Sequence, residues 1–344
     1  MKYICCVFLT LLVLNGCERE ITLDLPQPID KLVVEGKIEN GARPIVVLNK
    51  NFPYFGTFTF HTYLDNFVHN AEVTVSDGSN TVSLNEICFS ELDNEVDQLF
   101  FFQNILLPYY GDSLSVFDVL ANCNVNDLLG SSTDTLATDT TEVVSFEYCV
   151  YSFLGVPEMV GEEGKSYDLN INLNDGKQYT STTTIPYATA LDSIWVEQHP
   201  NPNYTNLWRL WAHHTEPEPI GHYYRYYTQS NCEPMYPGLG SVVDDLLTNG
   251  QTFPFPFDKA YPRGAELDFD TYGFFETGDS ILLKWATIDK ATYDFWRTLE
   301  FTANAAGPFG TTTQVISNVS GDGVLGVWGG YSVKKIYLIP SAGN

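Results

Sequence analysis

The sequence predicts a mainly β protein, on the basis of three observations. Short runs of Val, Thr, Ile and aromatic residues alternate with polar residues, which is the period of a half-buried strand. Asn-Gly and Asp-Gly pairs, which tolerate the positive φ of tight turns, follow several of these runs. Aromatic residues make up 14% of the chain and Met occurs only three times, a composition that favours strands. We expect an N-terminal immunoglobulin-like or transthyretin-like β-sandwich with an insertion, followed by a second antiparallel β domain that carries one helix.

The length of 344 residues allows about two domains. We place the boundary between them at Ile185-Pro186. The expected parts are a lipoprotein signal peptide at residues 1–16, a lipidated tether at 17–30, the sandwich domain at 31–186 with its insertion at 87–160, and the second β domain at 187–344.

The first seventeen residues predict lipidation. Lys2 is a minimal positive region, residues 3–14 are apolar, and Gly16 is the small residue that a signal peptidase requires before its cut. Cys17 follows directly, so we expect its thiol to carry a diacylglycerol and its amine a further acyl chain, an anchor that one chain alone does not provide. The alternatives are an ordinary signal peptide with a chance cysteine and a transmembrane helix. The latter needs about 20 apolar residues, more than this run contains.

The charge excludes several classes of partner. The chain has a formal net charge of −26, which becomes −27 once residues 1–16 are removed. An acidic protein of this kind does not bind nucleic acid, and it is not attracted to anionic lipid, so the lipid anchor must hold it on the membrane. No Lys or Arg occurs between residues 51 and 164. We interpret this stretch as a solvated acidic face, with a calcium-binding surface as the alternative.

Strands of the first domain are predicted from alternation and from turn residues. The turns are Asn40-Gly41, Asp77-Gly78 and Asp175-Gly176. The predicted strands lie at residues 32–38, 43–50, 71–77, 166–172 and 178–185.

The second domain combines further strands with one predicted helix. Asp289 is a good N-cap, and Ala291, Phe295 and Leu299 follow at helical spacing up to a break at residues 304–308. The predicted strands lie at residues 191–198, 206–213, 222–228, 250–257, 280–287, 323–328 and 332–339.

An aromatic segment at residues 51–67 interrupts the rhythm of short strands. Such a density of rings predicts either a stacking surface for a sugar or a docking surface for a partner. The alternative is a long hairpin packed on the domain. The residues of this possible binding surface are Phe52, Tyr54, Phe55, Phe58, Phe60 and Tyr63.

Four cysteines remain after Cys17, and three of them lie in the insertion. Cys88, Cys123, Cys149 and Cys232 are therefore disulfide candidates, and four cysteines allow three full pairings. None has C-x-x-C spacing, which argues against a zinc or thioredoxin-type site. We expect an insertion closed by a disulfide.

Histidines and acids gather near residue 215 and form the best metal candidate. They are His213, His214, Glu216, Glu218 and His222. Neighbouring residues of a strand point to opposite faces, so His213 and His214 are not expected to share an ion. We therefore predict no metal ion and no cofactor.

Other motifs give no catalytic assignment. Residues 321–326 match G-x-G-x-x-G, but β-type residues follow instead of the helix that a dinucleotide site requires. G-x-S-x-G, H-E-x-x-H, P-loop and EF-hand patterns are absent from the sequence. The pair Asp244-Asp245 is interpreted as shaping a loop, because a glycosidase needs two carboxyl groups placed across a cleft.

Several short segments, taken in their order along the chain, carry a family resemblance. They are residues 33–38, 44–48, 70–75, 176–181, 223–225, 244–250, 278–280, 293–296, 317–319 and 324–328. Together they resemble a Bacteroidetes outer-membrane lipoprotein family known only as domain of unknown function 4249. The resemblance implies an outer-membrane lipoprotein that is often encoded beside a TonB-dependent receptor of the SusC type, and it implies no catalytic residues.

The expected function is therefore that of a non-catalytic outer-membrane lipoprotein. It would be held on either face of that membrane by its lipid and would act as an accessory or binding subunit of a TonB-dependent receptor or another envelope complex. The alternative is a surface-exposed hydrolase, glycan-active or metal-dependent.

Overall fold

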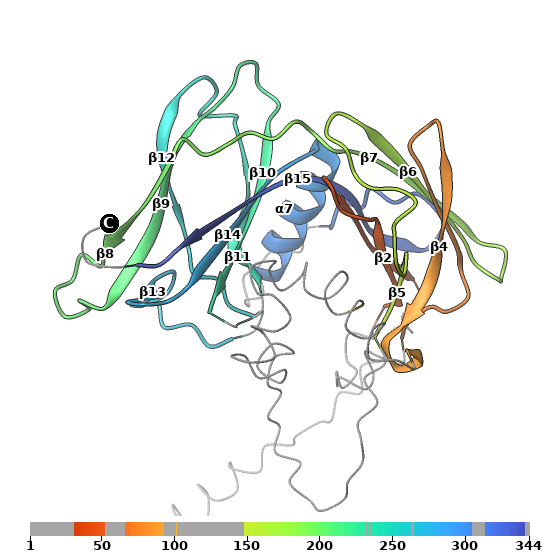
Figure 1. Cartoon of the computed structure of the whole chain (residues 1–344), viewed down its shortest axis with the longest axis horizontal. Coiled ribbons are helices and arrows are strands. Elements are labelled where there is room, and N and C mark those ends of the chain that lie inside the picture. The colour runs from red at the N-terminus through yellow and green to blue at the C-terminus, as the bar shows by residue number, and fades with distance from the viewer. Residues whose placement is uncertain are drawn as a thin grey trace, which may run out of the picture.

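The computed structural model describes residues 31–51, 66–92, 101, 148–231, 233, 235–262, 265–304 and 314–340. It confirms the predicted mainly β fold with a helix in the second half of the chain. Two lobes of strands flank helix α7 (Lys290–Asn304) (Figure 1). The first lobe contains β2 and β4 to β7, and the second lobe contains β8, β9 and β12. In this part of the chain no helix has both the length and the apolar composition needed to cross a membrane.

Among the described residues, a sheet of eleven strands runs through both lobes, in the order β11-β10-β14-β15-β1-β2-β5-β4-β3-β6-β7. Its neighbours pair antiparallel, except that β1 and β15 are parallel. The strands are β1 (Leu32–Glu39), β2 (Ile45–Lys50), β3 (Glu72–Ser76), β4 (Thr81–Cys88), β5 (Cys149–Ser152), β6 (Ser166–Asn172), β7 (Gln178–Thr184), β10 (Tyr223–Ser230), β11 (Tyr236–Asp244), β14 (Ile281–Ile288) and β15 (Val324–Leu338).

A second sheet covers one face of the second lobe. Its central strand β9 pairs with three others, all antiparallel. The strands are β8 (Ser193–Gln198), β9 (Leu207–Thr215), β12 (Thr252–Phe257) and β13 (Phe275–Glu276). Trp208, Tyr224, Phe257 and Trp285 pack between this sheet and the main one. The second lobe is therefore a sandwich of two sheets with an aromatic core.

Strand β15 joins the two halves of the chain. The sequence predicts two strands here, but the structure has one strand of 15 residues, which passes between β1 and β14. Gly329 and Gly330 do not break it. A Cβ atom at Gly330 would lie 2.7 Å from the Thr184 carbonyl oxygen, so this glycine serves a close approach to the end of β7. The main sheet thus continues across the boundary placed at residues 186 and 187.

The predicted start of the helix is confirmed. Asp289 caps α7, with the Thr292 amide donating to its Oδ1 at 2.8 Å. The other oxygen, Oδ2, accepts hydrogen bonds from the Thr183 hydroxyl and the Thr184 amide, at 2.8 and 3.0 Å. One carboxylate therefore begins the helix and fastens it to β7 in the other lobe.

Cys88 and Cys149 stand opposite each other on β4 and β5 and form a disulfide. The short 3₁₀ helix η1 (Phe89–Glu91) follows Cys88. The predicted insertion at 87–160 thus begins on β4 and contains β5, two paired strands that the sequence did not predict. Of the other disulfide candidates, Cys123 and Cys232 lie outside the described residues.

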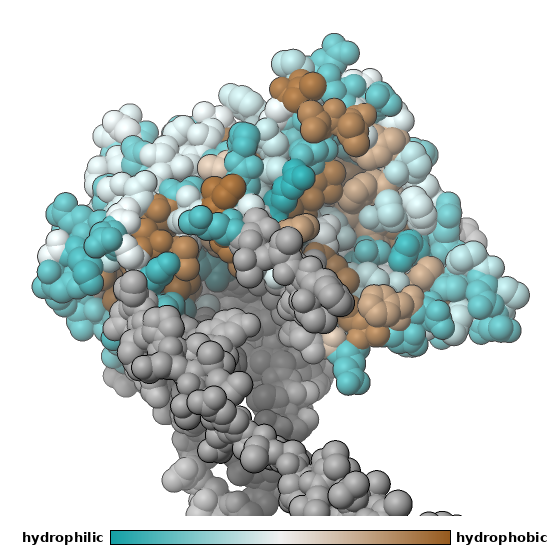
Figure 2. Space-filling view, turned by 180° about the vertical axis from the view of Figure 1, so that it is seen from behind, coloured by the Kyte–Doolittle hydropathy of each residue, from teal (hydrophilic) through white to brown (hydrophobic). Residues whose placement is uncertain are grey.

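Apolar residues also reach the surface of the second lobe. Seen from behind, apolar side chains lie among polar ones on both sides of the view (Figure 2). Among the described residues, the exposed large apolar residues of the second half of the chain are Tyr187, Ile220, Leu239, Leu246, Leu247, Phe269, Phe301, Ile316, Tyr337 and Ile339.

Candidate functional site

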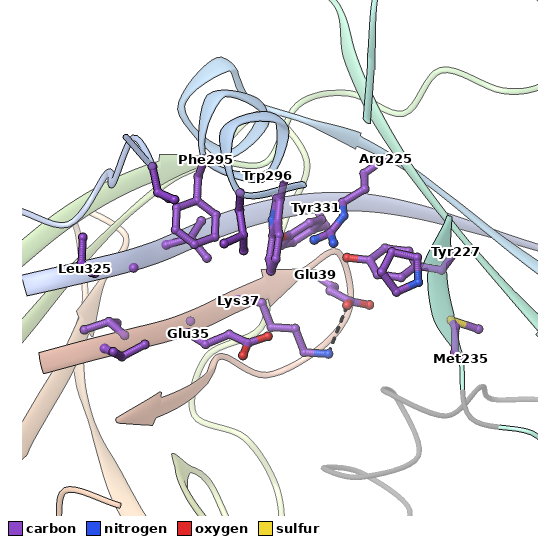
Figure 3. A pocket seen from close by; sticks show the side chains of 18 of the residues that line it. Glu35, Lys37, Glu39, Arg225, Tyr227, Met235, Phe295, Trp296, Leu325 and Tyr331 are labelled. Carbon is purple, nitrogen blue, oxygen red and sulfur yellow. Dashed lines mark hydrogen bonds and ion pairs between the residues drawn. The ribbon is translucent and has the colours of Figure 1, made fainter. Parts of the chain in front are cut away.

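A cavity of about 510 Å³ lies between the main sheet and helix α7, where the two lobes meet. In Figure 3 aromatic side chains of α7 face it from one side, and charged side chains of β1 face it from the other. Its walls come from β1, β10, β11, β14, β15, α7 and the segment before β15. The lining residues used below are Lys37, Glu39, Arg225, Lys284, Trp296 and Leu299.

The alternation of β1 explains why charges face this cavity. Val34 and Ile38 are fully buried in the core of the first lobe. Glu35, Lys37 and Glu39 occupy the intervening positions and therefore share the opposite face. Gly36 leaves room on the core side for the ring of Trp328, since a Cβ atom there would lie 2.7 Å from that ring.

Glu39 is the centre of a buried ion-pair group. The Lys284 ammonium lies 2.6 Å from its Oε1 and the Lys37 ammonium 3.5 Å from the same oxygen. Burial opposes ionisation of Glu39, but the two ammonium groups outweigh it and lower its pKa to about 2. Burial also lowers the pKa of Lys37 to about 8, although Glu39 favours the charged form.

Arg225 forms a second charged group and fastens the helix. Its guanidinium lies 3.5 Å from the ring centroid of Trp296, a cation–π contact, and 3.5 Å from Glu300 of α7. Glu300 in turn accepts the Ser241 amide of β11 at 2.9 Å. Since Arg225 is only 2% exposed, these contacts are what compensate its desolvation.

The rest of the wall is apolar. Trp296 is held by a hydrogen bond from its indole N–H to the Tyr331 hydroxyl, at 2.8 Å. The other apolar lining side chains include Met235, Phe295, Leu299, Val315, Leu325 and Val327. Apolar walls with a few fixed charges are typical of small-molecule sites. Such a cavity suits a ligand that has an apolar body and one polar group.

His213 and His214 face opposite sides of β9, as expected for neighbours on a strand, whereas His214, Glu216 and His222 come together. His213 is exposed on the outer face of β9, with its ring centroid 4.6 Å from that of Trp195. His214 points inward and is 2% exposed. His222 lies beside Glu216 and Asp245, away from His213.

Other predicted site residues lie outside the part of the chain that the structure describes. These are the predicted lipidation site Cys17 and the possible binding surface of Phe52, Tyr54, Phe55, Phe58, Phe60 and Tyr63.

The sequence analysis missed the cavity residues. The available signal was Glu35, Lys37 and Glu39 at alternate positions of an otherwise apolar strand, because charges on a face that should be buried mark an inward-facing polar site. Arg225 and Lys284 gave no such signal. Each is a single charge within a strand, and its partner comes from a distant element.

The chain matches a known family over most of its length. The family model described as "Domain of unknown function (DUF4249)" matches residues 18–336. No curated protein matches the chain.

Proposed function

The chain belongs to this DUF4249 family of unknown function, and we propose that it is a non-catalytic, lipid-anchored outer-membrane protein that binds a ligand in the cavity beneath α7. At the outer membrane it acts as a binding or accessory subunit of a TonB-dependent receptor or another envelope complex. The cavity is the observation that carries the proposal.

Two features of the cavity support a binding role. Its volume of about 510 Å³ falls within the range of small-molecule sites. Trp296 and Arg225 are fixed by mutual contact and by hydrogen bonds, so the wall is formed before any ligand arrives. Preformed walls lower the entropic cost of binding. The lipidation sequence ending at Cys17 supports the location, and Cys17 fits a protein held beside a membrane receptor.

The cavity is tested with the apolar anionic dye 1-anilinonaphthalene-8-sulfonate, whose fluorescence rises in apolar surroundings. We expect one saturable site on the purified protein. Leu299→Trp fills the cavity with a larger side chain and should weaken dye binding by about tenfold, which is about 1.4 kcal/mol. Leu247→Trp is the matched control, since Leu247 is 86% exposed and lies outside the cavity lining. Equal binding by wild type and Leu299→Trp would contradict the proposal.

The accessory-subunit role is tested by a mild-detergent pull-down from native outer membrane. A tag at Asn344 keeps the predicted lipidation site free, and mass spectrometry identifies what co-purifies. We expect a TonB-dependent receptor, or another fixed set of envelope proteins, in stoichiometric amount. Recovery of the protein alone would sink this part of the proposal and leave the cavity result standing.

A further inference from the structure

A second polar cluster lies at one end of the second lobe, apart from the cavity. Glu216 follows β9, His222 precedes β10 and Asp245 follows β11, so three chain segments converge. Each residue offers one ligand atom, and these three atoms lie within 4.8 Å of one another. The His222 Nδ1 atom is 3.3 Å from Asp245 Oδ2 and 3.9 Å from Glu216 Oε1.

The cluster buries two carboxylates, and no Lys or Arg among the described residues neutralises their negative charge. Glu216 is 3% exposed and Asp245 1% exposed. Among the described residues, the ion-pair partners of these two carboxylates are His214 and His222, with no Lys or Arg. Buried carboxylates are normally paired with a cation or coordinate a metal ion. The site therefore has the charge of a cation-binding site.

His214 provides an independent indication. It is 2% exposed, and within the described part of the chain neither of its ring nitrogens makes a hydrogen bond of good geometry. Its Nε2 atom points into the cluster and lies 3.1 Å from Glu216 Oε2. Buried polar atoms are rarely left without a partner, so this ring is placed to hold an oxygen of Glu216 when Glu216 ligates an ion.

The two carboxylates are also held in place by neighbouring donors. The amides of Gly221 and His222 donate to Asp245 Oδ2 at 2.8 and 3.1 Å, and the Tyr224 hydroxyl donates to Glu216 Oε1. Hydrogen bonds of this kind orient the ligands of metal sites. They reduce the rearrangement that an arriving ion would have to drive.

We propose that Glu216, His222 and Asp245 bind one divalent transition-metal ion, for which Zn²⁺ is the probe. One imidazole and two carboxylates are ligand types of zinc sites, and an imidazole disfavours Ca²⁺ and Mg²⁺, which prefer oxygen. His222 is partly exposed and gives the ion a route from solvent. The other described cluster of metal-ligand types, at His69 and Glu86, contains the disulfide-bonded Cys88 and Cys149, whose sulfurs are not thiolates.

The test uses the full chain without a histidine tag. The protein is stripped with EDTA, dialysed, and titrated with ZnCl₂ in a calorimeter, and the bound metal is counted by elemental mass spectrometry. We expect one Zn²⁺ per chain and a rise in Tm on adding Zn²⁺. His222→Ala should weaken binding by about tenfold or more, while His213→Ala should leave it unchanged, because His213 faces outward from the same lobe.

The test relies on His222→Ala because substitutions of the buried Glu216 or Asp245 could prevent folding. His222 is partly exposed, so His222→Ala should keep the circular dichroism spectrum and metal-free Tm of the wild type. Anomalous diffraction at the zinc edge should place its main peak between Glu216, His222 and Asp245. The proposal is overturned if binding is not saturable, if His222→Ala binds as tightly as wild type, or if the peak lies elsewhere.

Discussion

Gly326→Ala is expected to prevent stable folding, with a loss of about 3 kcal/mol or more in the free energy of unfolding. Gly326 has φ +151°, and an added Cβ atom would lie 2.0 Å from the Val34 carbonyl oxygen. That neighbour is backbone, and Val34 is the register partner of Gly326 in the pairing of β1 with β15. The clash therefore falls on the strand pair that unites the main sheet. Urea denaturation followed by circular dichroism measures the loss.

Gly240→Ala is the control for this variant. Gly240 also lies in a strand, but its φ is ordinary and a Cβ atom there would have no neighbour within 4 Å. Its free energy of unfolding should change by about 0.5 kcal/mol or less, as for surface substitutions without a special role. If Gly326→Ala were as stable as the wild type, β15 could not pass so close to β1.

Glu39→Gln should destabilise the protein by about 3 kcal/mol at pH 7. The substitution removes the carboxylate that compensates the buried Lys37 and Lys284 ammonium groups, and breaking a buried ion pair typically costs about 3–5 kcal/mol. Because the ammonium groups lower the pKa of Glu39 from 4.5 to about 2, linkage gives a similar figure of about 3 kcal/mol. Denaturant unfolding at pH 7 measures the loss.

The pH dependence has a definite sign. The pKa of Glu39 is lower in the folded than in the unfolded state, so its contribution is complete above pH 4.5 and is lost as the pH falls toward 2. Wild-type stability should decline through this range, and Glu39→Gln should decline less. If the free energy of unfolding of both proteins declined in parallel between pH 5 and pH 2, Glu39 would not be the group with the lowered pKa.

Two further variants isolate the ion pair. Glu35→Gln changes an exposed carboxylate on the same face of β1 and should shift the free energy of unfolding by about 0.5 kcal/mol or less. Glu39→Gln combined with Lys284→Met removes both members of the pair that lies 2.6 Å apart. The double variant should recover part of the lost stability, because the Lys284 ammonium is no longer buried without its carboxylate.

Local signals in the sequence predicted the elements well. Asp289 predicted the start of α7, and the Asp175-Gly176 turn predicted the hairpin β6–β7. Asp77-Gly78 predicted the turn after β3, but strand β4, which follows it, was not predicted. The rejection of a dinucleotide site at residues 321–326 agrees with the structure, because strand β15 and not a helix follows. Gly326, the last glycine of that pattern, serves the close approach of two strands.

Long-range pairings were not predictable from the same signals. Nothing local in residues 324–338 shows that this strand pairs with β1, almost 300 positions earlier. The cavity depends on such pairings, since Glu39 and Lys284 are 245 residues apart. Asp245 was predicted to shape a loop, and it does accept the amides of Gly221 and His222. Its place beside Glu216 and His222 appeared only in three dimensions.

The position of β15 also constrains when the protein can fold. Because this strand lies between β14 and β1, the main sheet cannot close until residues 324–338 have left the ribosome. A chain still under synthesis leaves one edge of β1 and one edge of β14 without their partner, and such edges invite wrong pairing. Pairing across so long a separation is also slow. The topology thus delays completion of the sheet until synthesis has passed residue 338.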